Sequence, residues 1–165
     1  MDLLDAGCGP APMISLLSEK YPEQHYTGLD LTPAMIEQAQ KKNIPNATFV
    51  VGDCENFPFE DNSFDSIICS NSFHHYPNPQ AFFDSVQRCL RPGGRLILRD
   101  ASSNNRLLLW FMDNIEVPLA NLCGHGDVKI ARRSVIEECC QKAGLKVESF
   151  EIRKGMRMHC VVRKV

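Results

Sequence analysis

Acidic residues and closely spaced glycines follow buried, strand-like runs in the first third of the chain. The motif Asp5-Ala6-Gly7-Cys8-Gly9 closes the first run, Asp30 closes the second, and Asp53 follows the third. Glycines let a backbone turn sharply and approach a ligand closely, and a carboxylate about 20 residues further on can accept hydrogen bonds from both hydroxyls of a ribose. Each position alone is typical of an ordinary turn or helix cap, but together they predict a nucleoside-binding site at one edge of a sheet.

The glycine motif departs from the turn that binds dinucleotides. That turn has the pattern G-x-G-x-x-G, whose last glycine permits close packing of helix on strand, and Pro12 stands at this position here. The proline therefore disfavours a nicotinamide-dependent oxidoreductase. We keep this hypothesis as weaker than the two that are given at the end of this section.

Strand-like and helix-like segments alternate along most of the chain, which is typical of an α/β fold. We expect one domain over residues 1–165, with a doubly wound, mostly parallel sheet of seven strands that ends in an antiparallel hairpin. The expected strands are 3–7, 25–31, 47–51, 64–70, 95–99, 147–152 and 158–162. The expected helices are 11–21, one from Pro33, one from Pro79, and one capped by the box Ser134-Val135-Ile136-Glu137 and ended by Gly144.

Residues 101–133 form a connection far longer than the usual few residues. An insertion at the carboxyl edge of a parallel sheet commonly covers a ligand, so we expect a substrate cover there. Its run Leu107–Met112 predicts a helix that is broken before Pro118. Such apolar residues are more often core than substrate contacts, but Trp110 is a candidate wall of the substrate pocket.

The composition excludes several classes of function. The 165 residues carry 18 Lys and Arg against 20 Asp and Glu, a net charge of −2, without the basic stripe that neutralises the phosphates of nucleic acids. The longest strongly apolar run, 107–112, is too short to cross a bilayer, and the start Met1-Asp2-Leu3 lacks a secretory signal. We therefore expect a cytoplasmic protein without a membrane span, whose partner is a small molecule and not a nucleic acid.

The chain has eight cysteines, and no two of them form a C-x-x-C pair. That spacing is typical of zinc and redox sites. We therefore expect most of the cysteines to be small buried apolar groups in a reducing compartment, and no metal site.

Five motifs in order resemble those of class I S-adenosylmethionine-dependent methyltransferases, in the small-molecule branch that resembles the ubiquinone and menaquinone C-methyltransferases. They are Leu3-Leu4-Asp5-Ala6-Gly7-Cys8-Gly9, Gly28-Leu29-Asp30-Leu31-Thr32-Pro33-Ala34-Met35, Gly52-Asp53-Cys54, Ser72-Phe73-His74-His75 and Leu90-Arg91-Pro92-Gly93-Gly94-Arg95-Leu96. The resemblance implies S-adenosylmethionine as cofactor and S-adenosylhomocysteine as its product. It implies a cofactor-binding set in which the turn of Asp5, Gly7, Cys8 and Gly9 lies against the amino-acid part, Asp30 holds the ribose, Leu31 packs on the adenine, Asp53 and Cys54 read its amino edge, and Asn71 faces the methionine part.

Two features depart from this family. Ala11 stands where the first motif often has a third glycine, which should narrow the turn slightly. The chain also starts two residues before its first strand, whereas family members usually carry helices there that close over cofactor and substrate. We therefore expect an exposed apolar face on the sheet or the first helix, and three explanations stay open: a fragment, a late start, or a homodimer that supplies the cover.

The expected reaction moves a methyl group from S-adenosylmethionine to a small-molecule acceptor by in-line displacement, in which positioning supplies most of the rate. A base is needed only if the acceptor must lose a proton, and the candidates are His74, His75, His125 and Asp100. His75 is the candidate catalytic residue and His74 a candidate pocket wall, although both are more often a wall or a helix-start contact. The alternative is a protein that binds the cofactor but is catalytically weak or inactive.

Overall fold

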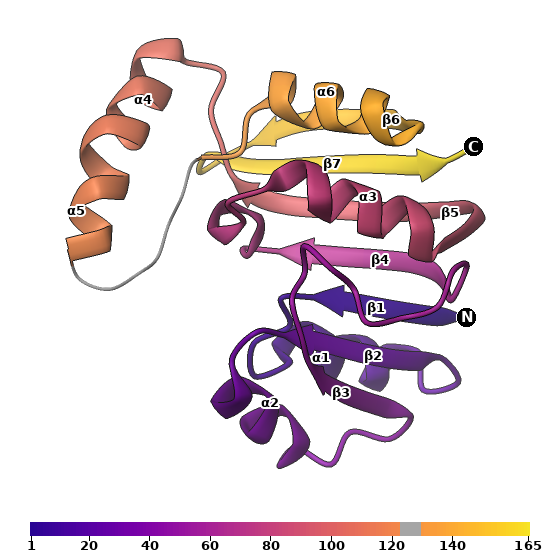
Figure 1. Ribbon diagram of the computed structural model, residues 1–165. Coiled ribbons are helices and arrows are strands. Elements are labelled where there is room, and N and C mark those ends of the chain that lie inside the picture. Colours follow the sequence, from indigo (N-terminus) through magenta and orange to yellow (C-terminus); the bar gives the residue numbers. More distant parts are fainter. Residues whose placement is uncertain (123–129) are drawn as a thin grey trace.

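Seven strands form one sheet in the computed structural model, in the order β3-β2-β1-β4-β5-β7-β6 (Figure 1). The structure describes residues 1–122 and 130–165. The strands are β1 (Asp2–Ala6), β2 (His25–Asp30), β3 (Ala47–Val51), β4 (Phe64–Ser70), β5 (Leu90–Ala101), β6 (Leu145–Arg153) and β7 (Arg157–Lys164). The pairs from β3 through β5 are parallel, and β7 runs antiparallel to both β5 and β6. The predicted fold class, a mostly parallel sheet with a final antiparallel hairpin, is confirmed.

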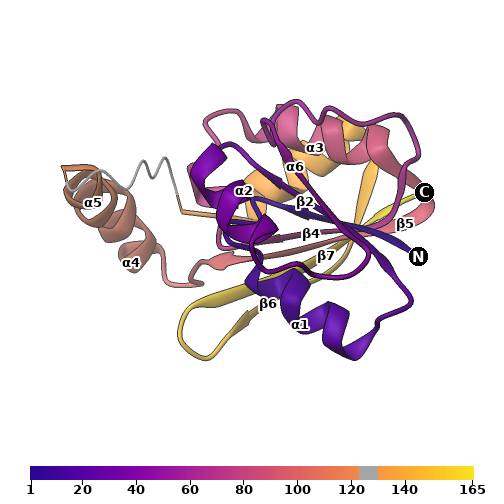
Figure 2. The ribbon, with the colours of Figure 1, turned by 90° about the horizontal axis from the view of Figure 1, so that it is seen from below.

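Helices cover the two faces of the sheet (Figure 2). Helices α3 (Pro79–Cys89) and α6 (Arg133–Ala143) pack on one face, with Phe82, Phe83 and Ile136 fully buried. Helices α1 (Pro12–Lys20) and α2 (Pro33–Gln40) cover β1 and β2 on the other face, with Ile14 and Ala39 fully buried. Neighbouring strand residues point to opposite faces, and Leu3 and Leu4 accordingly belong to different cores.

Parallel pairing sets the carboxyl ends of the strands at one edge, on the left of Figure 1. Ala6 of β1 lies beside Leu29 of β2, and Asp30 at the end of β2 lies beside Val51 of β3. The residues that follow these strands are therefore neighbours in space, although they lie about 20 positions apart in the chain.

Two local predictions about helix ends are wrong. Helix α6 begins at Arg133, one residue before the expected cap Ser134, and its N-cap position, Arg132, makes no side-chain cap hydrogen bond. Glu137, the expected partner of Ser134 in a capping box, instead accepts from Arg133 Nε at 2.8 Å. An ion pair one turn along the helix thus replaces the box.

The predicted break before Pro118 is also wrong, because helix continues through it. Helix α4 (Arg106–Phe111) passes directly into the π-helical turn η2 (Met112–Glu116) and then α5 (Val117–Leu122). A proline removes one backbone donor and crowds the preceding turn, and the wider π turn lies at the place where that crowding would occur. These three elements, the arm 106–122, extend beyond the carboxyl edge of the sheet (Figures 1 and 2).

Several apolar side chains of the arm and of α1 are exposed. On the arm they include Leu107, Trp110 and Leu119, and on α1 Leu16 is 65% exposed. Leu16 is a single exposed apolar side chain on α1, so the expected exposed apolar face stays a prediction. Among residues 1–122 and 130–165, no helix has the length and apolar character to cross a membrane.

Candidate active site

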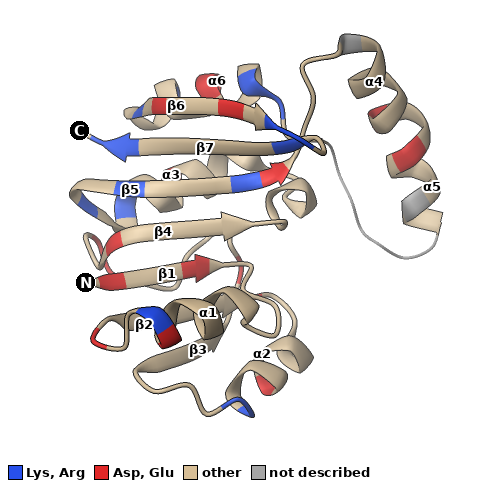
Figure 3. Cartoon of the chain, turned by 180° about the vertical axis from the view of Figure 1, so that it is seen from behind, with Lys and Arg blue, Asp and Glu red and all other residues tan. Residues whose placement is uncertain are grey.

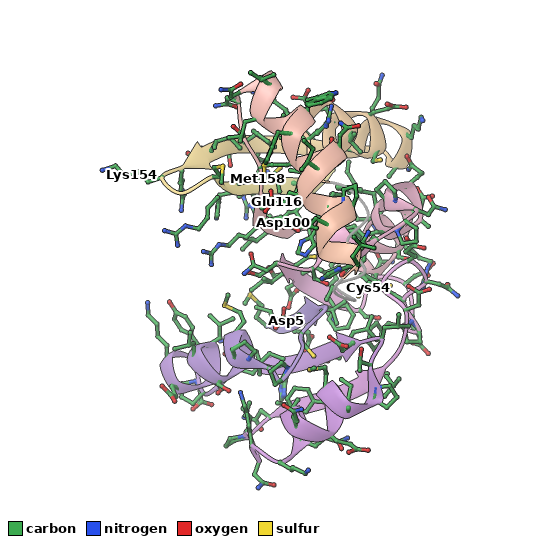
Figure 4. All side chains as sticks on the ribbon, turned by 90° about the vertical axis from the view of Figure 1, so that its left-hand side faces the viewer. Asp5, Cys54, Asp100, Glu116, Lys154 and Met158 are labelled. Atoms are coloured by element: carbon green, nitrogen blue, oxygen red, sulfur yellow. The ribbon has the colours of Figure 1, made fainter. Side chains whose placement is uncertain are left out.

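The carboxyl ends of β1 to β4 surround one open cavity of about 550 Å³. That volume lies in the range of small-molecule and cofactor sites. Figure 4 looks onto this edge and labels Asp5, Cys54 and Asp100, which lie near the carboxyl ends of β1, β3 and β5. The cavity is lined by Gly7, Gly9, Asp30, Leu31, Thr32, Met35, Asp53, Cys54, Glu55, Asn71, Ser72, His75, Tyr76 and Pro77.

The turn after β1 is held tightly against β2 and against the segment after β4. The backbone N–H of Gly7 donates to the Leu29 carbonyl at 2.8 Å. Gly7 has φ +73°, and a Cβ built there would lie 1.9 Å from Ser72 Oγ. Only glycine fits this position, because it lacks a Cβ and accepts the left-handed conformation. At Gly9, φ +52°, a Cβ would meet no atom within 4 Å.

Asp30 supports the glycine turn and still has acceptor capacity. Its Oδ2 accepts from the Gly9 N–H at 2.8 Å, and its Oδ1 accepts from the Thr32 N–H at 2.9 Å. An ionised carboxylate has about four acceptor sites, so each oxygen can accept one further hydrogen bond. Two acceptor oxygens side by side suit a pair of neighbouring hydroxyl groups, as in a ribose.

Asp53 and Cys54 lie together at the end of β3 and differ in exposure. Asp53 is exposed, and its Oδ1 accepts from the Glu55 N–H at 2.8 Å, so it is also an ordinary turn residue. Cys54 is only 5% exposed, and burial is the main cause that raises the pKa of its thiol to about 12. Near neutral pH the thiol is therefore protonated, a weak donor beside a carboxylate acceptor.

Asn71 links the end of β4 to β5. Its backbone is left-handed, with φ +54°, which asparagine tolerates better than most residues. Its N–H donates to the Arg99 carbonyl at 2.8 Å. This hydrogen bond fixes the cavity wall to the neighbouring strand.

Asp5 and Cys8, the two other predicted cofactor contacts, are buried and do not belong to the described lining of the cavity. They are 2% and 4% exposed. Burial, and then the charge of Asp30, raise the pKa of Asp5 to about 7, and burial raises the pKa of Cys8 above its ordinary value. Both residues flank Gly7 in the chain and are buried, so they suit a role in packing under the glycine turn.

The two neighbouring histidines of η1 (Phe73–His75) have different surroundings. His75 is exposed and lines the cavity. His74 Nδ1 lies 2.7 Å from Asp100 Oδ1, and the His74 N–H donates to Asp100 Oδ2 at 3.1 Å. Asp100 is 3% exposed, so a buried carboxylate orients the His74 ring. His125 lies outside the described residues.

Trp110 does not join the cavity lining in the described part of the chain. It lies on the arm and is 55% exposed. Conversely, the sequence reasoning missed Ser72 and Tyr76, whose hydroxyl oxygens lie 2.9 Å apart under the glycine turn. Both stand within or next to the motif that contains the two histidines, which could have indicated them.

No group of three or more His, Cys, Asp or Glu side chains in residues 1–122 and 130–165 is arranged to hold a metal ion. All seven described cysteines are free and buried. The prediction that most cysteines are buried apolar groups is confirmed.

Comparison with known proteins places this cavity in context. Residues 4–98, more than half of the chain, match a family described as "Methyltransferase domain". Phthiotriol/phenolphthiotriol dimycocerosates methyltransferase 1 of Mycobacterium ulcerans is 40% identical over 121 residues, which are 73% of this chain and 45% of the relative. A fatty-acid O-methyltransferase of Mycolicibacterium smegmatis is 35% identical over 121 residues, 73% of this chain and 44% of the relative. The chain thus spans about half the length of these curated relatives.

A solved structure shares the fold. The SAM-dependent methyltransferase from Aquifex aeolicus superposes with a TM-score of 0.79 at 19% identity, over 100% of this chain and 82% of that one. The predicted fold, the predicted enzyme class and S-adenosylmethionine as the predicted methyl donor are in accord with these findings. The chain belongs to the methyltransferase domain family.

Proposed function

We propose that this chain holds S-adenosylmethionine in the cavity of 550 Å³ and transfers its methyl group to a small, largely apolar acceptor. The observation that carries the proposal is the convergence of Gly7, Asp30, Asp53 and Asn71 on one cavity at the carboxyl edge of four neighbouring strands. The relatives are named as methyltransferases, which favours an enzyme over a protein that only binds the cofactor.

The residues of the cavity fit the parts of this cofactor. The Asp30 carboxylate has two acceptor sites left for the ribose hydroxyls, and the Asp53 carboxylate can accept from an amino group of the adenine. Leu31 is 70% exposed at the cavity, and a flat ring would cover it. The open space beside Gly9 leaves room for the amino-acid part of the cofactor.

S-adenosylmethionine supplies a methyl group on a positively charged sulfur, which leaves as a neutral thioether. The protein therefore has to orient the acceptor and exclude water more than it has to activate the donor. His75, which lines the cavity, is our candidate to receive a proton when the acceptor has to lose one. Asp100 holds His74 in place, so we assign His74 to the wall beside the site.

An apolar acceptor is supported by two observations. The arm 106–122 exposes Leu107, Trp110 and Phe111 by 75%, 55% and 47% beyond the edge that carries the cavity. The two relatives are named for dimycocerosates and for a fatty acid, which are lipid acceptors. We keep Trp110 as a candidate acceptor contact. A cytoplasmic location and a homodimer stay predictions.

Calorimetric titration with S-adenosylhomocysteine tests the proposal. We expect the wild type to bind it and Asp30→Ala to bind at least about tenfold more weakly, because charge-assisted hydrogen bonds contribute on the order of 1.5 kcal/mol or more. Asp61→Ala, at an exposed carboxylate outside the cavity lining, is the matched control and should bind like the wild type. Equal affinity in all three proteins, with unchanged melting curves, would exclude this cofactor site.

A further inference from the structure

A second, smaller hollow lies at the outer half of the same sheet edge. It has a volume of about 260 Å³ and is lined by Arg99, Arg153, Lys154, Arg157, Met158 and His159. These residues come from the end of β5 and from the β6–β7 hairpin, and Figure 3 shows the blue segments of β5, β6 and β7 close together there. We call the five residues other than Met158 the basic hollow.

The positive charge of the basic hollow is poorly neutralised. Glu151 pairs with Arg153 at 3.1 Å, and Arg157 Nε donates to the Lys154 carbonyl. Among the described residues, neither Arg99 nor Lys154 has an acidic side chain within ion-pair distance, and Figure 4 shows Lys154 extending outward from the hairpin. Four cations thus face one carboxylate, on a chain whose net charge is −2.

The positive charges of the basic hollow act on His159. It lies directly opposite Arg99 in the β5–β7 pairing. Burial lowers the pKa of His159, the charges of Arg153 and Arg99 lower it further, and Glu151 acts in the opposite direction. The imidazole is therefore mostly neutral near pH 7, and the net positive charge of the hollow comes from the arginines and the lysine.

The basic hollow adjoins the cofactor cavity. Arg99 is paired with Ser70 in β4, and its carbonyl accepts from Asn71, which lines that cavity. The cofactor cavity and the basic hollow thus meet where the end of β4 pairs with β5. The base of the arm is tied to the same hairpin, because the Ser102 N–H donates to the Met156 carbonyl at 2.8 Å.

We propose that the basic hollow binds an anionic group, a carboxylate or a phosphate, of the methyl acceptor. Arginine matches both groups through paired N–H donors. The inference rests on the proposed function and sharpens it: the acceptor is an amphiphile whose charged end lies among Arg99, Arg153, Lys154 and Arg157 and whose apolar part lies toward the arm.

The first experiment tests the anion site with inorganic phosphate and needs no acceptor. The His159 ring is followed by NMR through a pH titration, with phosphate or with chloride at equal ionic strength. A bound anion should offset the arginine charges, so we expect phosphate to raise the His159 pKa in a saturable way. The triple variant Arg153→Gln/Lys154→Gln/Arg157→Gln should lose this response. Lys20→Gln/Lys41→Gln/Lys42→Gln, which removes the same charge far from the hollow, should keep it.

The second experiment tests whether the anion belongs to the acceptor. Binding of hexadecanoate and of hexadecanol, which share a chain length and differ in charge, is measured in the presence of S-adenosylhomocysteine. We expect hexadecanoate to bind about tenfold more tightly to the wild type and to the control variant. In the hairpin variant the two affinities should be equal.

The outcomes separate this inference from the proposed function. No response of His159 to phosphate, or an identical response in the hairpin variant, overturns the anion site. Equal affinity of the two amphiphiles in the wild type overturns its assignment to the acceptor. Titration of the same variants with S-adenosylhomocysteine reports on the cofactor site alone, and we expect its affinity to stay unchanged.

Discussion

The inner and outer halves of the sheet edge build their sites by different means. In the inner half, β3, β2, β1 and β4 are parallel, and each places functional residues at its last residue or shortly after it. In the outer half, Arg99 comes from β5, while Arg153, Lys154 and Arg157 come from a hairpin more than 50 residues further along the chain. The inner site follows from strand register, whereas the outer one depends on how the hairpin folds back on β5.

The difference extends to what holds the functional groups. Backbone hydrogen bonds fix the inner residues: Gly7 donates to Leu29, Gly52 to Asp30, and Asn71 to Arg99. The outer cations are long side chains with few fixed partners. A rigid site suits a cofactor of constant shape, and flexible charges suit acceptors that vary.

The largest effect should come from Gly7→Ala, which would disrupt the glycine turn of the cofactor cavity. The added Cβ would lie 1.9 Å from Ser72 Oγ in a left-handed residue, so we expect a loss of about 3 kcal/mol of unfolding free energy and no measurable binding of S-adenosylhomocysteine. Gly144→Ala is the matched control, because Gly144 has φ +72° and open space around it. It should cost about 1 kcal/mol and leave binding intact. Equal losses in the two variants would contradict the clash.

Asp5→Asn should change how stability depends on pH. The pKa of Asp5 is raised from 3.8 to about 7 in the folded protein, first by burial and then by Asp30. Between these two values the folded state holds the proton more strongly than the unfolded state, so this contribution to stability falls as pH rises, by at most about 1.4 kcal/mol per pH unit. Urea unfolding from pH 4 to 8 should show the decline in the wild type and not in Asp5→Asn.

Asp65→Asn provides a control, because the contribution of Asp65 to stability depends on pH in the opposite direction to that of Asp5. A hydrogen bond from the Asp2 N–H, with Arg91 nearby, lowers the pKa of Asp65. Its contribution is therefore present above the ordinary carboxyl pKa and is lost as pH falls through the lowered value. A common slope in both variants would mean that neither carboxyl causes the dependence.

A smaller effect is expected at Ala11, where the structure places an alanine at φ 56° and ψ 47° before α1. Relief of left-handed strain by Ala11→Gly is offset in part by the flexibility of glycine in the unfolded chain. We expect a gain of up to about 1 kcal/mol in thermal or urea unfolding. A clear loss of stability would show that the methyl group of Ala11, fully buried in its core, contributes more than the strain costs.

The smallest effect on the inner half should come from Trp110→Ala in the arm. Trp110 is 55% exposed, so we expect the unfolding free energy to change by less than about 0.5 kcal/mol and the affinity for S-adenosylhomocysteine to stay the same. Binding of hexadecanoate should weaken. A change in cofactor affinity without a change in hexadecanoate binding would show that Trp110 contacts the cofactor and not the acceptor.

The predictability of the site follows the same division. Asp30, Asp53 and Asn71 could be placed from the sequence because each follows an apolar run, and parallel pairing brings the ends of such runs together. Ser72 and Tyr76 could not, because their contacts with the glycine turn join residues more than 60 positions apart. The basic hollow could not be predicted from the sequence, because its arginines are dispersed along the chain. They come together only through the strand order β5-β7-β6.

The fold predictions failed where a local rule met a neighbouring interaction. Ser134 and Glu137 have the spacing of a capping box, but Arg133 pairs with Glu137 instead. Pro118 is a helix breaker by type, but the π turn before it lets the helix continue. Such exchanges between alternatives of similar free energy are not encoded in residue type alone.

The π turn also determines how the arm presents its side chains. In a regular α-helix, residues four apart drift by about 40° around the axis, so a long series at this interval winds sideways. One wider turn between residues 112 and 116 reduces that drift, and Leu107, Phe111, Ile115 and Leu119, all exposed by more than 40%, form a straighter file. The arm thereby offers a linear ridge, parallel to its own axis, along which an unbranched hydrocarbon tail could extend.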